Sequence, residues 1–383
     1  MYIIQKLLDM CRIRDYDNET ASSKNSDIII SIERHQHKSH SSTFTHDDYV
    51  RIRRYWKCIP PQFCTRNYID ATPEEYLLYG KTLLLNAYQR CAPLPNGYCC
   101  YFYEECKLSN PAGIHKDLIK QGYFTNPSVS ELLWSYTVKE LKPIAKSLGC
   151  KCSGLKKDII NNIIANMPLE QQQLLINNSD CYIISDKGRR FLEYNSDYVE
   201  LHRNFKLMIS LSELNRVRIK NGTRQPFTDS ALEIISSHIE EDCIIHNFTN
   251  MIFDTSALYN ILLKQSDYNR AAIAYLKFLY LKSCCSFSID LFNNDLPVYP
   301  VDTAPIFSSY CAVEIVRLSH FINDRLIIET YNTDSLPPSL LTLQEFTNMI
   351  HDMLEQPVFD YDVYNNIIYQ RLKYLAVIDY NSV

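Results

Sequence analysis

Residues 137–163 read TVKELKPIAKSLGCKCSGLKKDIINNI and carry the strongest structural signal in the chain. Thr137 is followed three positions later by Glu140, a spacing typical of a capping box at the start of a helix. Apolar side chains then recur at helical spacing, at Val138, Leu141, Ala145 and Leu148. Gly149 follows where a residue with positive φ commonly ends a helix. We therefore expect a short amphipathic helix that ends at Gly149.

A second helix is expected directly after it. Cys150 and Cys152 alternate with Lys151, which predicts an extended connector, and Ser153 and Gly154 are expected to open the helix with Ser153 as its N-cap. Its apolar face is expected to consist of Ile159, Ile160, Ile163 and Ile164. A helix N-terminus exposes unpaired amides and a positive dipole end, which suit an anion. Lysines gather beside this end, at Lys151, Lys156 and Lys157. The pattern indicates a surface for phosphate.

The segment resembles the SAP domain, a small two-helix module associated with DNA and sometimes RNA binding. The match runs without a gap through Thr137, Leu141-Lys142, Leu148-Gly149, Ser153-Gly154-Leu155-Lys156, Ile159-Ile160 and Ile163. The chain departs from the family at Cys150, usually leucine, and at Asn162, often arginine. It also has Pro143 inside the first helix, where we expect a kink. The resemblance implies contacts with a phosphate backbone from Lys142, Lys151, Ser153, Gly154, Lys156 and Lys157.

The flanking segments extend this resemblance. Residues 96–124 predict a short helical unit ending in a turn, similar to segments that precede SAP domains in uncharacterised proteins of low-GC Gram-positive bacteria and their phages. Residues 182–192, YIISDKGRRFL, predict a strand, a turn and a helix, a pattern frequent in winged-helix proteins. Arg189 and Arg190 in this tail join the expected nucleic-acid contacts. We expect a SAP-domain-containing protein of such bacteria or phages.

The expected fold class is mainly α, with four parts. Residues 1–50 are expected to be a mobile arm or linker, because Ser, Asn, Asp, Thr and His are frequent there. Residues 51–135 are expected to form a small helical N-terminal domain, in which Thr72-Pro73-Glu74-Glu75 starts a helix that ends near Arg90. Residues 136–195 would form the SAP-like module with its winged-helix-like tail. Residues 196–383 would form a separate helical C-terminal domain of unknown fold.

The charge distribution agrees with a nucleic-acid surface in the middle of the chain. The whole chain has a net charge of −5. Residues 51–195 nevertheless carry 19 basic and 13 acidic side chains, whereas residues 196–383 carry 14 basic and 23 acidic ones. Nucleic-acid affinity depends on the local density of lysine and arginine, so the acidic total does not exclude binding. With 8 glycines and no Gly-rich phosphate loop, the chain does not resemble a nucleotide-binding enzyme.

Other candidate sites carry weaker signals. Fourteen cysteines, with no pair of C-x-x-C motifs, favour reduced thiols in a cytoplasmic protein and no metal site. No cofactor, membrane segment or catalytic motif is expected, although an enzyme in the C-terminal part stays open. Residues 51–57, RIRRYWK, fit either a surface that stacks on bases or holds a nucleic-acid backbone, or an edge strand or helix start whose aromatic side chains join the core. The acidic pairs, such as Glu74-Glu75 and Glu104-Glu105, read as ordinary helix positions.

The sequence thus predicts a nucleic-acid-binding protein, with DNA favoured over RNA and with contacts made mainly to the backbone. Residues 196–383 would associate with a protein partner or with a second copy of the chain. The alternative is a protein-interaction scaffold in which the SAP-like unit is structural. Exposure of the turn and its lysines would favour nucleic-acid binding, whereas burial of the turn would favour the scaffold.

Overall fold

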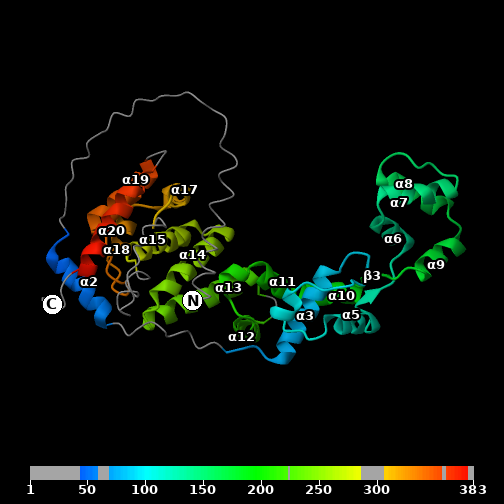
Figure 1. Cartoon of the computed structure of the whole chain (residues 1–383), viewed down its shortest axis with the longest axis horizontal. Coiled ribbons are helices and arrows are strands. Elements are labelled where there is room, and N and C mark those ends of the chain that lie inside the picture. Colours follow the sequence, from blue (N-terminus) through cyan, green and yellow to red (C-terminus); the bar gives the residue numbers. More distant parts are fainter. Residues whose placement is uncertain (1–43, 59–68, 223–224, 286–305, 356–358, 378–383) are drawn as a thin grey trace, which may run out of the picture. The chain divides into compact units, whose positions relative to one another are not determined.

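The computed structural model describes residues 44–58, 69–222, 225–285, 306–355 and 359–377 (Figure 1). Helices make up most of these residues, so the expectation of a mainly α protein is confirmed. Residues 1–43 of the expected N-terminal arm, residues 1–50, lie outside the described residues. Its last residues belong to helix α2 (His46–Cys58), which begins inside the segment expected to be mobile.

Short helices and three very short strands make up the first half of the described chain. After α2, the described helices before residue 180 are α3 (Pro73–Ala87), α4 (Tyr101–Glu104), α5 (Pro111–Lys120), α6 (Val129–Ser135), α7 (Val138–Ser147), α8 (Lys156–Asn166) and α9 (Leu169–Asn177). The strands are β1 (Ala92–Pro93), β2 (Phe124–Thr125) and β3 (Cys181–Ile184). The start of α3 is as expected, because Thr72 and Glu75 form a capping box and Pro73 occupies the first turn.

The second half of the described chain is formed by helices of 8 to 18 residues. They are α10 (Asp186–Tyr194), α11 (Ser196–Arg203), α12 (Leu211–Asn221), α13 (Phe227–Ile244), α14 (Phe248–Lys264), α15 (Tyr268–Ser283), α17 (Ser309–Arg317), α18 (Asp324–Tyr331), α19 (Leu343–Glu355) and α20 (Asp362–Val377). Within the described ranges, two 3₁₀ turns, η2 (Phe205–Leu207) and η3 (Ser319–Phe321), join neighbouring helices. Met208, between η2 and α12, has a φ of 55°, so the chain leaves the right-handed helical conformation there.

The three strands form one small antiparallel sheet in the order β1-β3-β2. Ala92 pairs with Tyr182 on one edge of β3, and Thr125 pairs with Ile183 on the other. The central strand therefore comes last in the sequence. The expected strand and helix at residues 182–192 are present as β3 and α10, and β3 lies between two strands from the preceding part of the chain.

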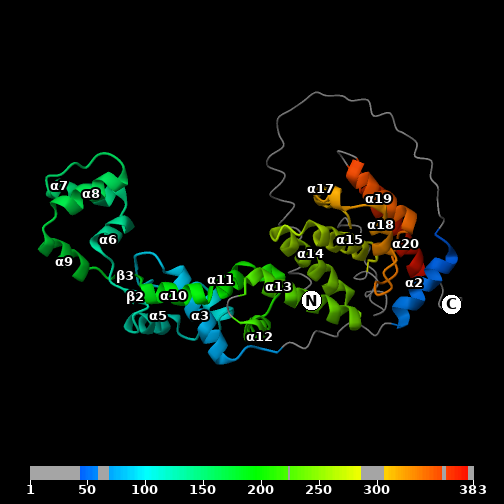
Figure 2. The same ribbon diagram turned by 180° about the vertical axis from the view of Figure 1, so that it is seen from behind.

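One hydrophobic cluster belongs entirely to the chain between β2 and β3. Its buried residues are Val129, Leu133, Leu141, Ala145, Ile159, Ile160, Ile163 and Met167. These side chains come from α6, α7 and α8 and from the residue that follows α8, and Leu175 and Ile176 of α9 pack against them. We call residues 129–179 the inserted module. Helices α7 and α8 lie side by side in both views of the chain (Figures 1 and 2).

A second cluster joins parts of the chain that the sequence assigns to different domains. Tyr79 and Leu83 of α3 are buried together with Ile184 of β3 and with Tyr198 and Leu201 of α11. Phe191 and Leu192 of α10 pack against the same cluster. The core therefore divides the chain differently from the expected boundaries at residues 135 and 195, because β3, α10 and α11 share a core with α3.

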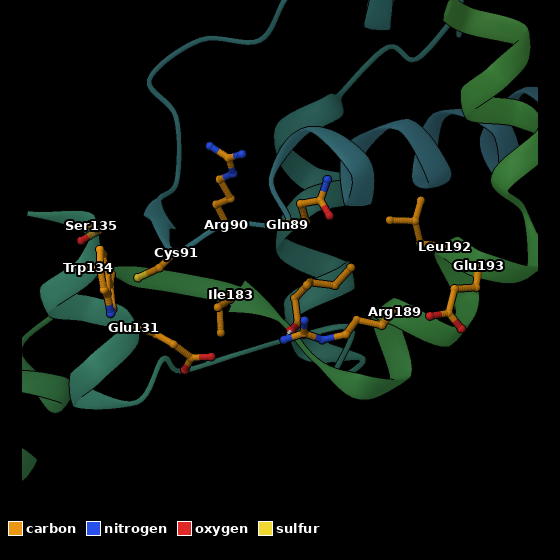
Figure 3. Close-up of a pocket in the computed structure, with 11 residues that line it drawn as sticks. Gln89, Arg90, Cys91, Glu131, Trp134, Ser135, Ile183, Arg189, Leu192 and Glu193 are labelled. Carbon is orange, nitrogen blue, oxygen red and sulfur yellow. Dashed lines mark hydrogen bonds between the residues drawn. The ribbon is translucent and has the colours of Figure 1, made fainter. Parts of the chain in front are cut away.

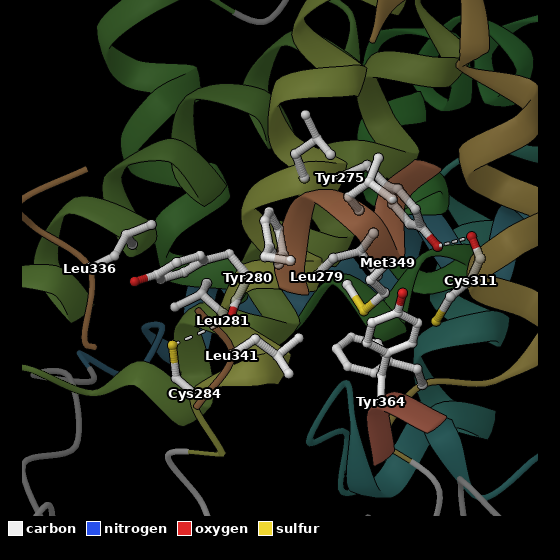
Figure 4. Packing of buried hydrophobic residues seen from close by; sticks show 14 of the residues in the cluster. Tyr275, Leu279, Tyr280, Leu281, Cys284, Cys311, Leu336, Leu341, Met349 and Tyr364 are labelled. Atoms are coloured by element: carbon white, nitrogen blue, oxygen red, sulfur yellow. Dashed lines mark hydrogen bonds between the residues drawn. The ribbon is translucent and has the colours of Figure 1, made fainter. Parts of the chain in front are cut away.

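The third cluster, the largest among the residues that the structure describes, is formed by α14, α15 and the helices after residue 306, and it includes Ile52 and Trp56 of α2. Tyr275 and Tyr280 lie along α15 within it (Figure 4). The hydroxyl of Tyr275 donates to the Cys311 carbonyl at 3.2 Å, and that of Tyr280 donates to the Pro337 carbonyl at 2.9 Å. Buried tyrosines therefore keep their polar ends paired.

Candidate nucleic-acid interface

Helix α7 presents one apolar and one basic face. The Thr137 hydroxyl accepts from the Glu140 amide at 3.4 Å, and the Glu140 carboxylate accepts from the Thr137 amide at 2.7 Å, so the predicted capping box is confirmed. Leu141 and Ala145 are buried against α8. Exposed lysines occur at spacings of three and four residues, at Lys139, Lys142 and Lys146. Because 3.6 residues make one turn, these three lysines share one face of the helix.

The turn after α7 has the geometry that the glycine predicts. Gly149 has a φ of 67°, its amide donates to the Lys146 carbonyl at 3.0 Å, and the Cys150 amide donates to the Ala145 carbonyl at 3.0 Å. This pair of bonds is a Schellman motif, which satisfies the last carbonyls of the helix and reverses the chain. The side chain of Lys151 is exposed in the connector that follows. Helix α7 also continues through Pro143 without interruption.

The start of α8 differs from the prediction. The helix begins at Lys156 with Leu155 as its N-cap residue, so Ser153 is exposed before the helix and does not cap it. The Leu155 amide donates to the Asp158 carboxylate at 3.3 Å. Gly154 has a φ of 116°, a conformation that favours glycine, and it lies beside the same carboxylate. An internal anion therefore occupies the helix end where the sequence predicts a phosphate.

The two adjacent lysines at the start of α8 have different surroundings. The Lys156 ammonium donates to the Trp134 carbonyl at 2.7 Å and lies 5.3 Å from the centroid of the Trp134 ring. Trp134 is near the C-terminal end of α6, where carbonyls lack partners within the helix and attract cations. Lys157 is exposed and makes no hydrogen bond or ion pair with any described residue. Lys156 thus holds α6 against α8, whereas Lys157 is available to a ligand.

Five lysines of the inserted module, Lys157 among them, have the same surroundings. Their side chains are exposed, and within the described part of the chain they have no hydrogen-bond or ion-pair partner. We call them the lysine cluster: Lys139, Lys142, Lys146, Lys151 and Lys157. Lys139 and Lys146 were not among the predicted contacts, although their spacing from Lys142 indicates a shared face. Between residues 137 and 167 the acidic side chains are Glu140 and Asp158, and both are engaged at helix N-termini.

Asn162 occupies the position where the SAP family often has arginine, and its amide has a local role. Its Nδ2 donates to the Lys151 carbonyl at 3.3 Å, which ties the connector to α8.

Glu140, at the start of α7, has a lowered pKa because its carboxylate accepts hydrogen bonds from the backbone amide and then from the hydroxyl of Thr137, so this carboxylate stays charged. The lysine cluster is therefore displayed by a short scaffold whose turn and caps are internally bonded.

The two predicted arginines lie on α10, outside the inserted module. Arg189 donates from Nη2 to the Ile184 carbonyl at 3.4 Å, and Arg190 donates from Nε to the Asp186 carbonyl at 3.3 Å. Both side chains are largely exposed. Helix α10 packs closely against the end of β2, since a methyl group at Gly188 would lie 2.3 Å from the Tyr123 carbonyl oxygen. Arg189 also lines a pocket with Trp134, described below.

The basic and aromatic segment RIRRYWK forms part of a core helix. Trp56 is 1% exposed, and its ring centroid lies 5.8 Å from that of Phe248. Ile52 is fully buried, and Arg53 donates to the Leu375 carbonyl at 2.9 Å. The structural interpretation of this segment is therefore confirmed, because Trp56 presents no face on which a base could stack.

One member of each of the acidic pairs Glu74-Glu75 and Glu104-Glu105 takes part in bonds that stabilise the fold. Glu75 belongs to the capping box of α3 and also accepts from the Asn215 amide at 2.8 Å. Glu105 accepts from the Tyr79 hydroxyl and pairs with His202 Nδ1 at 2.9 Å. Within the described ranges, no group of three or more histidine, cysteine or acidic side chains is arranged to hold a metal ion.

Two further results bear on what the chain resembles. Over the residues that the structure describes, no helix combines the length and the apolar character needed to span a membrane. Comparisons of the chain with protein-family models, with curated proteins and with solved structures gave no match.

Proposed function

We propose that this chain binds nucleic acid through the lysine cluster of the inserted module. The single observation that carries the proposal is the set of five exposed ammonium groups without partners among the described residues. The backbone that carries these lysines is already ordered before binding, because the capping box and the Schellman turn fix it. The resemblance of residues 137–163 to the SAP domain favours DNA over RNA.

Exposure of the turn supports this proposal over a scaffold in which the module merely packs internally. Gly149, Lys151, Ser153 and Gly154 are all exposed. The contacts are expected to come from lysine side chains, because the Asp158 carboxylate already occupies the N-terminus of α8. Such contacts position a backbone without reading its sequence. We therefore expect binding that depends strongly on salt and weakly on sequence.

The test is a salt titration of binding to fluorescent duplex DNA, single-stranded DNA and RNA. If each lysine of the cluster neutralises one phosphate, the log-affinity against log-salt slope on duplex DNA is about −4.5, at ~0.9 per phosphate. The variant Lys142→Ala/Lys151→Ala/Lys157→Ala leaves two of the five lysines, so its slope should be about −1.8. Lys156 is left intact because it bonds to the Trp134 carbonyl.

A matched control variant removes the same number of positive charges from lysines outside the inserted module. Lys116, Lys120 and Lys206 are exposed lysines outside residues 129–179, and their triple alanine variant should keep the slope of the wild type. Equal slopes for the two triple variants, or no binding by the wild type at low salt, would rule out the lysine cluster as the binding surface.

A second role, association with a protein partner or a second copy, is favoured by α17. Tyr310, Val313 and Val316 recur every three residues along this helix, and all three side chains are exposed. Exposed apolar side chains on one helix face favour a protein contact. Light scattering over a range of protein concentrations tests self-association, and Val313→Glu should abolish any dimer that uses this face. A mass independent of concentration would rule out self-association through this face.

A further inference from the structure

A pocket of about 710 Å³ opens where the inserted module leaves the small sheet (Figure 3). Its walls come from the segment after α3, from α6, from β3 and from α10. Its aromatic and charged lining residues are Trp134, Arg90, Arg189, Glu131 and Glu193. This volume falls within the range of roughly 300–1,000 Å³ that is typical of sites for small ligands.

Trp134 forms an aromatic wall of this pocket. Its side chain is 48% exposed, whereas the chain's other tryptophan, Trp56, is 1% exposed. The backbone around Trp134 is held from two sides, because Ser128 and Glu131 cap α6 and Lys156 bonds to the Trp134 carbonyl. Lys156 lies over one side of the ring and does not line the pocket, so the other side of this half-exposed indole offers a flat face for stacking.

Charged groups of both signs face the same pocket. Arg90 is exposed and makes no hydrogen bond or ion pair with any described residue. Arg189 lies across the pocket from Trp134 (Figure 3). The Glu131 carboxylate accepts from the Ser128 amide at 2.8 Å and from its hydroxyl at 2.7 Å, and Glu193 is exposed at the far wall. Two guanidinium and two carboxylate groups make the lining neutral overall.

This lining selects among small ligands. A bare anion would meet two carboxylates, and a simple cation would meet two guanidinium groups, so neither uses the whole site. A nucleobase has a flat aromatic face, and its edge carries donors for carboxylates and acceptors for guanidinium groups. The phosphate attached through its sugar would add a partner for an arginine.

We propose that this pocket binds one nucleotide unit, with the base stacked on Trp134 and the phosphate held by Arg90 or Arg189. The unit is supplied by a single strand that also crosses the lysine cluster, and in this respect the proposal rests on the proposed function. A free mononucleotide carries the same chemistry and is the other source that the experiment distinguishes. Duplex DNA cannot enter, because its bases are stacked within the helix.

The experiment uses the full chain and the fluorescence of its two tryptophans. A 12-nucleotide single strand should quench the emission of the exposed Trp134, whereas the same sequence as a duplex should not. Binding is measured in parallel by the anisotropy of a labelled strand. Trp134→Leu should weaken single-strand binding about 5- to 150-fold, the effect of removing one stacked base. Trp134→Phe keeps an aromatic face, so it should retain affinity while the quenching signal disappears.

Tyr103→Leu is the matched control. Tyr103 is also 48% exposed but does not line the pocket, so its replacement should leave single-strand affinity unchanged. AMP, CMP, GMP and UMP test the other source. If quenching shows that a mononucleotide binds as tightly as the strand, the pocket is supported and its ligand is a free nucleotide. The proposal is overturned if Trp134→Leu, with a wild-type circular dichroism spectrum, binds the single strand and the mononucleotides like the wild type.

The two proposals fail in different ways. If the lysine cluster does not bind nucleic acid, the triple lysine variant keeps the salt dependence of the wild type, while mononucleotides still quench Trp134. If the pocket does not bind a nucleotide, nucleotides cause no quenching, or cause the same quenching in Trp134→Leu as in the wild type. The salt slope on duplex DNA would still become less negative in the triple lysine variant. Arg90→Ala and Arg189→Ala provide an independent check, since at least one of them should weaken binding of nucleotides but not of the corresponding nucleosides. An unchanged nucleotide affinity in both variants would exclude these arginines as partners of the phosphate.

Discussion

Replacing Lys156 by methionine should weaken folding of the inserted module, whereas the same change at Lys157 should weaken binding. Lys156 donates to the Trp134 carbonyl at 2.7 Å and lies over its ring, whereas Lys157 has no such partner among the described residues. A charge at a helix C-terminus contributes about 0.3–1 kcal/mol, and an exposed cation–π contact about 0.5–1 kcal/mol. We therefore expect Lys156→Met to lower the unfolding free energy by about 1–2 kcal/mol.

Lys157→Met should change the unfolding free energy by less than about 0.5 kcal/mol, as is usual for an exposed side chain. It should instead reduce the salt slope on duplex DNA by about 0.9, the contribution of one phosphate contact. Lys156→Met should leave that slope nearly unchanged, because its ammonium is already bonded. Methionine suits both positions, since it keeps a long unbranched side chain and a good helix propensity.

Two assays separate the effects. Urea unfolding followed by tryptophan emission reports on Trp134 within the module, and a denaturant slope of about 1 kcal/mol per molar would give a midpoint shift of about 1 M or more for Lys156→Met. Fluorescence anisotropy over a salt range gives the binding slopes. If the two variants unfold at the same urea concentration and lose the same salt slope, Lys156 is a phosphate contact like its neighbour. The assignment of Lys156 to the α6 carbonyl would then be refuted.

Two further predictions concern the second hydrophobic cluster. Burial would raise the pKa of Glu213, but hydrogen bonds from His238 and Ser210 outweigh it and lower the pKa from 4.5 to about 2. A lowered acid pKa stabilises the fold above pH 4.5, so up to about 3 kcal/mol should be lost as the pH falls from 4.5 to 2. Urea midpoints over this range should depend less on pH in Glu213→Gln, and an unchanged pH dependence would exclude this carboxylate as the cause. Gly188→Ala should lower the unfolding free energy by about 1–3 kcal/mol, because its methyl group would overlap the Tyr123 carbonyl oxygen. Gly97→Ala is the control, since a methyl group there meets nothing within 4 Å; thermal unfolding compares the two, and equal melting temperatures would contradict the overlap.

The features that were predictable from the sequence are those set by neighbouring residues. The Thr137 capping box and the positive φ of Gly149 each depend on a few adjacent positions, and both are present. The prediction of Ser153 as the N-cap of α8 was wrong. The N-cap is Leu155, because the Asp158 carboxylate accepts a hydrogen bond from the Leu155 amide. Local spacing favours a serine, but the side chain three residues into the helix decides the outcome.

Long-range partners were beyond prediction from the sequence. Strands of two residues, such as β1 and β2, have too few positions to show an alternating pattern, so their pairing with β3 leaves no signal. The hydrogen bond from Lys156 to the Trp134 carbonyl joins positions 22 residues apart, and nothing in the spacing of the lysines distinguishes it from Lys157. The pocket walls likewise come from segments that only tertiary packing brings together.

The pairing of Thr125 with Ile183 places the two ends of the inserted module on adjacent, antiparallel strands. Everything between them is, in topological terms, an enlarged hairpin loop. A two-residue Asn-Gly turn would suffice to join β2 to β3. All buried members of the module's cluster lie within the loop, and none is shared with the other two clusters. Evolution or an experimenter can therefore lengthen, exchange or remove this loop while the remaining hydrophobic cores keep their side chains, and the surface it displays can change independently of the fold that supports it.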